Sequence, residues 1–172
     1  MFIFNKTKHF DKVINTTFNY NMKIINVLNE MLTCFGAKPY IEKDANKFVS
    51  ITFLHVLFLQ ECVLQKKYYP KYKNEVSAVF DAMIYEIAKR CNYKFEALKD
   101  IYFSLRNIFD KIAIDDKYGD INLYYRFSVS YIFALFNEEY KPEEHGFELG
   151  ETEYSLANVF QSVMTDTQKY LK

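Results

Sequence analysis

One stretch of the sequence, residues 44–67, would be apolar almost all round if it formed a helix. A helix without a polar face is stable in water only when other elements cover it on all sides. Asp44 is a suitable N-cap for this helix, and Pro70 follows shortly after its end. The stretch therefore predicts a central, buried helix. Its apolar positions include Phe48, Val49, Ile51, Phe53, Leu54, Val56, Leu57, Phe58 and Leu59.

Five other segments repeat apolar residues at three- and four-residue spacing, which is the period of one face of a helix. In the first segment, residues 7–34, Asn and Thr side chains between residues 15 and 21 weaken the helix pattern and allow a kink or break there. Gly36 suits the left-handed residue past the end of this segment. Thr152 is the expected N-cap of the last segment. The predicted helices cover residues 7–34, 71–90, 94–114, 120–136 and 152–171.

The segment 120–136 is the one place where two sequence signals disagree. Its Tyr, Phe, Val and Ile residues have high strand propensity. A ladder of apolar residues at every fourth position, from Leu123 to Leu135, favours a helix instead. We expect a helix, because the spacing holds along the whole segment.

The number of turn-forming residues agrees with a helical protein. The 172 residues include four Gly and three Pro, and a sandwich or barrel with many tight turns would need more of both. Half of the residues are hydrophobic, which excludes a disordered chain. The sequence thus predicts one all-α domain over residues 1–172, an antiparallel bundle of five to seven helices around a central apolar helix at about 44–67.

The charge of the chain is zero in total but uneven along the sequence. Residues 1–73 carry 11 basic and 5 acidic side chains, whereas residues 115–172 carry 5 basic and 11 acidic ones. Zero net charge argues against a protein that binds polyanions through its whole surface. Three cysteines without a CxxC pair, no signal-peptide pattern at residues 1–10 and no long apolar run predict a cytoplasmic protein outside the membrane.

Motifs for metal binding or catalysis do not stand out in the sequence. His145 lies in an acidic loop, and His55 is predicted to pack in the core beside Cys62. All three cysteines follow apolar stripes, so we expect them to be core thiols. The loop 115–120 has no oxygen ligand at three of the positions that a calcium loop requires, so we expect a turn there, with Asp120 as an N-cap. Phosphate-binding and nucleophile motifs are also missing from the sequence. These observations favour a protein that is not an enzyme and has no cofactor or metal.

Basic and aromatic residues alternate between residues 66 and 73. Such a patch can hold phosphates and stack bases, although lysines also commonly complete the last turn of a helix. The residues of this possible nucleic-acid patch are Lys66, Lys67, Tyr68, Tyr69, Lys71, Tyr72 and Lys73.

Acidic and aromatic residues alternate between residues 138 and 154, which we call the acidic segment. A loop that only aids solubility needs the carboxylates but not the aromatic rings, whereas a docking surface for a basic protein uses both. On this interpretation charge guides the encounter and the rings hold the complex. The predicted partner-binding residues are Glu138, Glu139, Tyr140, Glu143, Glu144, Phe147, Glu148, Glu151, Glu153 and Tyr154.

Three functions therefore stay open from the sequence. The first is a non-catalytic inhibitor, of the kind of bacterial immunity proteins and antitoxins, that blocks a basic toxin or nuclease through the acidic segment as a monomer or weak dimer. This rests on analogy in size and character. The second is a helical nucleic-acid-binding protein that uses the patch at 66–73. The third is an enzyme whose site forms only in the folded chain.

Overall fold

A computed structural model describes residues 3–68, 73–114 and 121–170, with the side chains of most of them. Over this part of the chain there are seven α-helices, one 3-10 helix and no strand, so the predicted all-α bundle is confirmed. In chain order the helices are α1 (Ile3–Cys34), α2 (Lys38–Lys43), α3 (Ala45–Tyr68), α4 (Lys73–Arg90), α5 (Phe95–Ile114), α6 (Ile121–Phe136), the 3-10 helix η1 (Pro142–His145) and α7 (Glu151–Tyr170).

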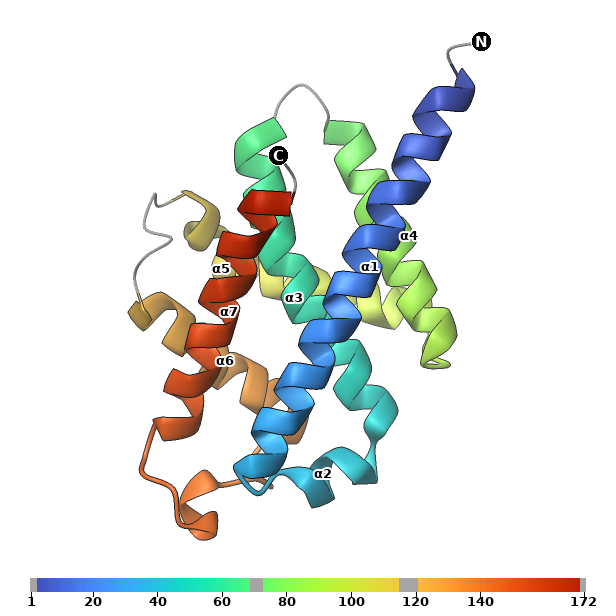
Figure 1. The fold of residues 1–172 in the computed structure, drawn as a ribbon. Coiled ribbons are helices and arrows are strands. Elements are labelled where there is room, and N and C mark those ends of the chain that lie inside the picture. The colour runs from blue at the N-terminus through green and yellow to red at the C-terminus, as the bar shows by residue number, and fades with distance from the viewer. Residues whose placement is uncertain (1–2, 69–72, 115–120, 171–172) are drawn as a thin grey trace.

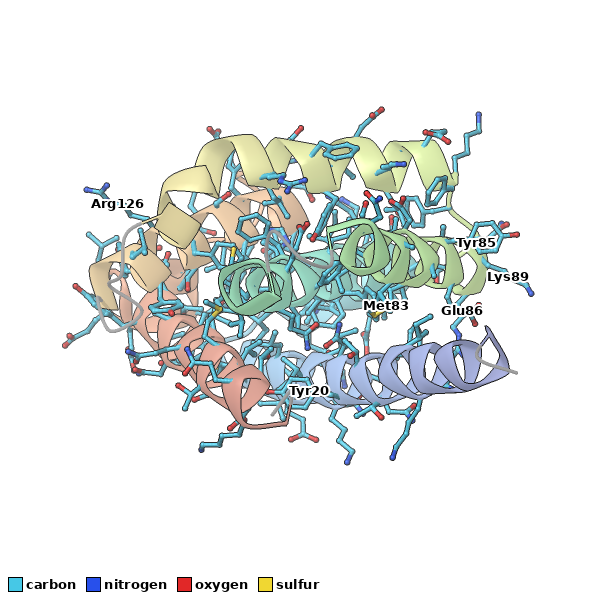
Figure 2. All side chains as sticks on the ribbon, turned by 90° about the horizontal axis from the view of Figure 1, so that it is seen from above. Tyr20, Met83, Tyr85, Glu86, Lys89 and Arg126 are labelled. Carbon is cyan, nitrogen blue, oxygen red and sulfur yellow. The ribbon has the colours of Figure 1, made fainter. Side chains whose placement is uncertain are left out.

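Helix α3 is the centre of the bundle, as its sequence predicts. It packs against each of the six other α-helices, and every residue from Ser50 to Val63 is buried. Figure 1 shows α3 running behind α1 and beside α7, and Figure 2 shows it from above between α5 and α1. The apolar side chains of this helix form the core shared by the outer helices, which need only one apolar face each.

Helix α1 is unbroken, although its sequence allowed a kink between residues 15 and 21. Asn15, Thr16 and Asn19 lie on its exposed side, and Thr17 and Asn21 are buried. Weak helix propensity is a small effect for each residue, and the contacts of α1 with α3, α4 and α7 outweigh it. The predicted helix at 120–136 is confirmed as α6. Phe127 and Tyr131, two members of the apolar ladder at every fourth position, are fully buried.

Two predicted helix ends are confirmed and one is wrong. Asp44 is the N-cap of α3, since its Oδ1 accepts the Lys47 backbone N–H at 2.9 Å. Gly36 ends α1 in the left-handed conformation at φ +84°, and the next N–H reaches back from Ala37 to the Leu32 carbonyl at 2.9 Å. Thr152 is not an N-cap, because α7 begins one residue earlier, at Glu151.

Two short helices were not predicted. Helix α2 follows the Gly36 turn, with Pro39 near its start, and η1 begins directly at Pro142. Both lie at the same end of the molecule, below α1 and α7 in Figure 1. This end carries most of the acidic segment.

Candidate functional site

The acidic segment connects α6 to the first turn of α7 and contains η1. Of its carboxylates only that of Glu153 belongs to a half-buried residue. The exposed ones are those of Glu138, Glu139, Glu143, Glu144, Glu148 and Glu151. The structure therefore brings together the predicted acidic residues on one connection at one end of the bundle. Its aromatic residues do not share one environment.

Tyr140 faces inward. Only 3% of its surface is exposed, and its ring lies against Phe136, Tyr40 and His145 at centroid distances of 5.1, 5.5 and 5.8 Å. Its hydroxyl donates a hydrogen bond to the Phe35 carbonyl at 2.7 Å. Burial of the ring raises the pKa of Tyr140 to about 12, so the hydroxyl stays a donor at neutral pH. Tyr140 ties the acidic segment to the end of α1.

Phe147 and His145 fasten the same segment at two further points. The ring of Phe147 is half-buried and packs edge-on against Phe35 at 4.7 Å. The ring of His145 lies so close to Gly36 that a Cβ atom at that position would be 2.6 Å from the His145 Cγ. The glycine is thus needed for the left-handed turn and for the close approach of η1.

The outward-facing apolar residues of the acidic segment are Leu149 and Tyr154. Leu149 is 85% exposed in the turn before α7, and Tyr154 is 49% exposed, with its ring 4.5 Å from that of Tyr125. Leu149 was not among the predicted site residues, although the sequence places it between Glu148 and Glu151. A leucine so exposed and flanked by carboxylates has little to contribute to the fold.

Ion pairs occupy part of the acidic surface. Glu139 binds Lys43 of α2 at 2.7 Å, and Glu144 lies 3.6 Å from Lys141. The hydrogen bond between Lys43 and Glu139 lowers the pKa of Glu139 and raises the pKa of Lys43. Within the described part of the chain, Glu138, Glu143, Glu148 and Glu151 have no ion pair. The surface therefore keeps an excess of negative charge.

The predicted nucleic-acid patch lies largely outside the described residues. Tyr69, Lys71 and Tyr72 fall in the range that is not described, as does the loop 115–120. The last turn of α3 contains Lys66, Lys67 and Tyr68, and α4 begins at Lys73. The side chains of these four residues also lie outside the described part of the chain.

The histidine and cysteine side chains give no ligand cluster. Among the described residues no three His, Cys, Asp or Glu side chains could share a metal ion. His55 and Cys62 are buried in α3 as predicted, and Cys91 is buried too. The expectation of a core thiol is wrong for Cys34, the last residue of α1, which is exposed.

A buried polar cluster between α3 and α5 was not predicted. The Tyr102 hydroxyl donates a hydrogen bond to Glu61 Oε2, and Arg106 Nη2 lies 3.6 Å from Glu61 Oε1. Burial, and next the negative charge of Glu61, raise the pKa of Tyr102 well above its usual value. The cluster satisfies a carboxylate inside the core, which is a structural role.

Comparisons of the chain with protein-family models, with curated proteins and with solved structures find no match. No helix of the described residues is both long enough and apolar enough to cross a bilayer.

Proposed function

We propose that this protein is a non-catalytic inhibitor that binds a basic surface of another protein through the acidic segment. The observation that carries the proposal is Leu149, an 85% exposed leucine in a turn flanked by Glu148 and Glu151. An exposed apolar side chain among carboxylates that have no ion pair to another described residue fits a contact in which charge speeds association and the leucine enters a pocket of the partner.

In this proposal Leu149 and Tyr154, rather than Tyr140 and Phe147, hold the partner. Tyr140 is committed to the core and Phe147 to the contact with Phe35, so Leu149 and Tyr154 are the residues with apolar surface to offer. Because Tyr140 and Phe147 fix the segment to α1, its carboxylates are held in place before binding. A surface ordered in advance loses less conformational entropy when it binds.

We propose further that the partner is a basic toxin or nuclease, which makes this chain an immunity or antitoxin-type protein of a bacterial cell, acting in the cytoplasm. A nuclease must present cationic side chains to the phosphate backbone, and an acidic surface can cover them. The support is the acidic excess of residues 115–172, which carry 11 acidic and 5 basic side chains.

The experiment is a capture of partners from the host cell, followed by binding kinetics with the captured protein. The double reversal Glu143→Lys with Glu148→Lys should slow association by about tenfold at low salt and much less at high salt. The matched control is Glu30→Lys with Asp100→Lys, which changes the same charge at exposed positions on α1 and α5. Equal association rates for the two double variants would contradict the proposal.

Leu149→Ala tests the holding contact without disturbing the fold. It should speed dissociation, because truncated hot-spot residues act mainly on the dissociation rate. Phe133→Ala is the control, since Phe133 is 58% exposed but lies on α6 outside the acidic segment. If Leu149→Ala leaves dissociation unchanged, the partner is held elsewhere, and residues 66–73 become the next surface to test.

A further inference from the structure

Two tyrosine rings meet at the surface where the acidic segment enters α7. Tyr125 of α6 and Tyr154 of α7 have ring centroids 4.5 Å apart, with an angle of 39° between the ring planes. Tyr154 is 49% exposed, and Tyr125 is half-buried. Gly150 lies against the Tyr125 hydroxyl, because a Cβ atom on this glycine would be 3.1 Å from that oxygen. The tyrosine pair is thus fixed by both helices and offers part of its aromatic surface to a ligand.

Carboxylates lie around the tyrosine pair. Burial raises the pKa of Tyr125, and the negative charges of Glu153 and Glu143 raise it further. Glu151 lies three residues before Tyr154, which places both on one face of α7. Oε2 of Glu153 is buried and has no hydrogen-bond partner among the described residues. None of these three carboxylates has an ion pair with another described residue, so the negative charge around the pair is not neutralised there.

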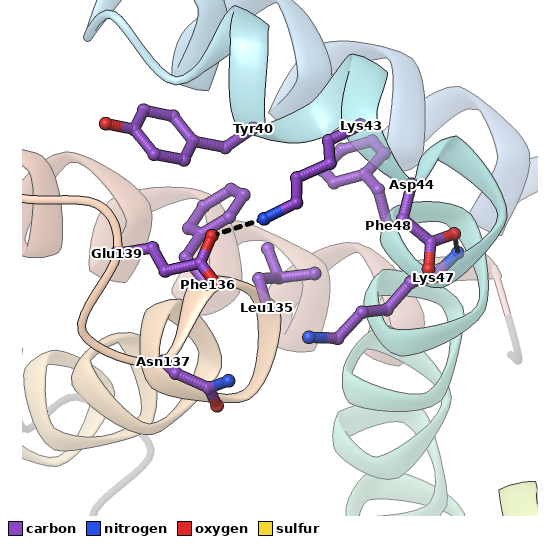
Figure 3. Close-up of a pocket in the computed structure, with 9 residues that line it drawn as sticks. All are labelled: Tyr40, Lys43, Asp44, Lys47, Phe48, Leu135, Phe136, Asn137 and Glu139. Carbon is purple, nitrogen blue, oxygen red and sulfur yellow. Dashed lines mark hydrogen bonds and ion pairs between the residues drawn. The ribbon is translucent and has the colours of Figure 1, made fainter.

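The other end of the acidic segment differs, because its charge is already paired. Figure 3 shows Glu139 joined to Lys43 of α2, and the two charged atoms are 2.7 Å apart. The hydrogen bond with Lys43, and to a smaller extent the charge of Lys47, lower the pKa of Glu139. A cationic side chain of a partner therefore meets more uncompensated charge at the tyrosine pair than beside α2.

The contact between α1 and α4 shows how this chain combines an aromatic ring with charges. The guanidinium carbon of Arg90 lies 4.2 Å from the centroid of the Phe18 ring. Nε of the same arginine is 2.8 Å from Glu86 Oε1. A cation over the face of a ring is attracted by its π electrons. The ring is thus completed by a cation, which is itself held by a carboxylate.

A second group of this kind lies between α4 and α5. Lys99 Nζ is 5.3 Å from the centroid of the Phe95 ring and 3.5 Å from Asp81 Oδ1. The tyrosine pair has the rings and the carboxylates, but no cation of a described residue lies over either ring. Arg126 follows Tyr125 in the sequence, yet Figure 2 shows its side chain pointing away from the bundle. A cation is therefore the one member that the described chain does not supply at the tyrosine pair.

We propose that the partner supplies this cation as an arginine side chain that lies over the Tyr154 ring. Because it needs a basic protein partner, this proposal rests on the proposed function. A guanidinium group is planar, so it can stack on the ring and donate hydrogen bonds in its own plane to a carboxylate beside the ring, such as that of Glu151. An ammonium group has no flat face to lie on the ring and is more strongly hydrated. Lysine is therefore the weaker ligand.

The probe is a pair of capped peptides, one alternating glycine with arginine and the other glycine with lysine. Each is titrated at low salt into the isotope-labelled full chain and followed by the backbone amide signals in NMR spectra. We expect saturable shifts at Tyr125 and Tyr154, with about threefold tighter binding of the arginine peptide. Equal affinities of the two peptides for the acidic segment would overturn the arginine proposal but leave the proposed function standing. No saturable shift in the acidic segment with either peptide would contradict the proposed function as well.

Two substitutions of Tyr154 separate the aromatic face from its apolar area. Tyr154→Phe keeps the face and should keep the preference for the arginine peptide. Tyr154→Leu keeps an apolar side chain without the face, and should make the affinities of the two peptides equal. Tyr85→Leu is the control, because Tyr85 is 60% exposed and its ring also packs on another ring, but it lies on α4 outside the acidic segment. A preference that survives in Tyr154→Leu, or that Tyr85→Leu removes equally, would show that the tyrosine pair does not bind the guanidinium group.

Discussion

His55 should make the stability of this protein depend on pH between about 6.5 and 4. Its ring is fully buried in α3, between Phe127 at 5.3 Å and Tyr131 at 5.1 Å. Its Nδ1 lies 2.8 Å from the Ile51 carbonyl, which can only accept, so Nδ1 carries the proton. Nε2 is buried and has no hydrogen-bond partner among the described residues. Burial disfavours a second proton on the ring and lowers the pKa of His55 from 6.5 to about 4.

The direction of the effect follows from the two pKa values. Below pH 6.5 the unfolded chain takes up a proton on His55, whereas the folded chain does so only near pH 4. The contribution of His55 is therefore complete above pH 6.5 and is lost as the pH falls toward 4. The loss in the free energy of unfolding is about 2 kcal/mol at pH 5 and about 3 kcal/mol at pH 4.

The assay is urea denaturation followed by circular dichroism, at several values of pH from 7.5 to 4, for the wild type and for His55→Leu. Other groups titrate in both proteins, so the difference between the two curves isolates His55. The wild type should lose about 2 kcal/mol more than His55→Leu between pH 7.5 and pH 5. Parallel curves would refute the reasoning, because they would mean that His55 takes up its proton equally in the folded and unfolded chains.

Three further substitutions test how the core and the acidic segment are held. Leu57→Ala, at a fully buried position of α3, should lower the free energy of unfolding by about 2–5 kcal/mol, and an unchanged denaturation midpoint would show that α3 is not central. Tyr140→Phe removes the hydrogen bond to the Phe35 carbonyl and should cost about 1 kcal/mol in the same assay, with no loss if that carbonyl is well hydrated. Gly36→Ala should lower the free energy of unfolding, because it strains the left-handed backbone and places a Cβ atom against His145. The double variant with His145→Ala should recover the loss due to the clash and keep a loss of about 1–2 kcal/mol due to the backbone. Full recovery in that double variant would show that the backbone conformation costs nothing.

The helices could be predicted from the sequence because each of the long ones repeats its own local pattern. The stretch that is apolar almost all round identified α3 as central, and the spacing from Leu123 to Leu135 correctly outweighed strand propensity in α6. Helix α2 was missed, although Pro39 next to its start is a recognised signal of a helix N-terminus. A six-residue helix is too short to show a periodic pattern, so only this end signal could have found it.

The contacts that shape the candidate site could not be predicted, because they join residues far apart in the sequence. Tyr140 and the Phe35 carbonyl are separated by 105 positions, and Tyr102 and Glu61 by 41. A tyrosine in an acidic loop has the same local sequence whether its ring faces the core or the solvent. A glutamate within an apolar run does signal a buried partner, but the run does not say which residue that partner is.

The inward direction of Tyr140 also decides how the acidic segment has to be tested. Replacing Tyr140 by alanine would remove three aromatic contacts and a hydrogen bond, so weaker partner binding in that variant would report a loosened segment rather than a lost contact. Leu149 is free of this ambiguity, because its side chain is 85% exposed and its truncation leaves the fold unchanged. An effect of Leu149→Ala on dissociation, with an unchanged free energy of unfolding, therefore identifies a contact with the partner itself.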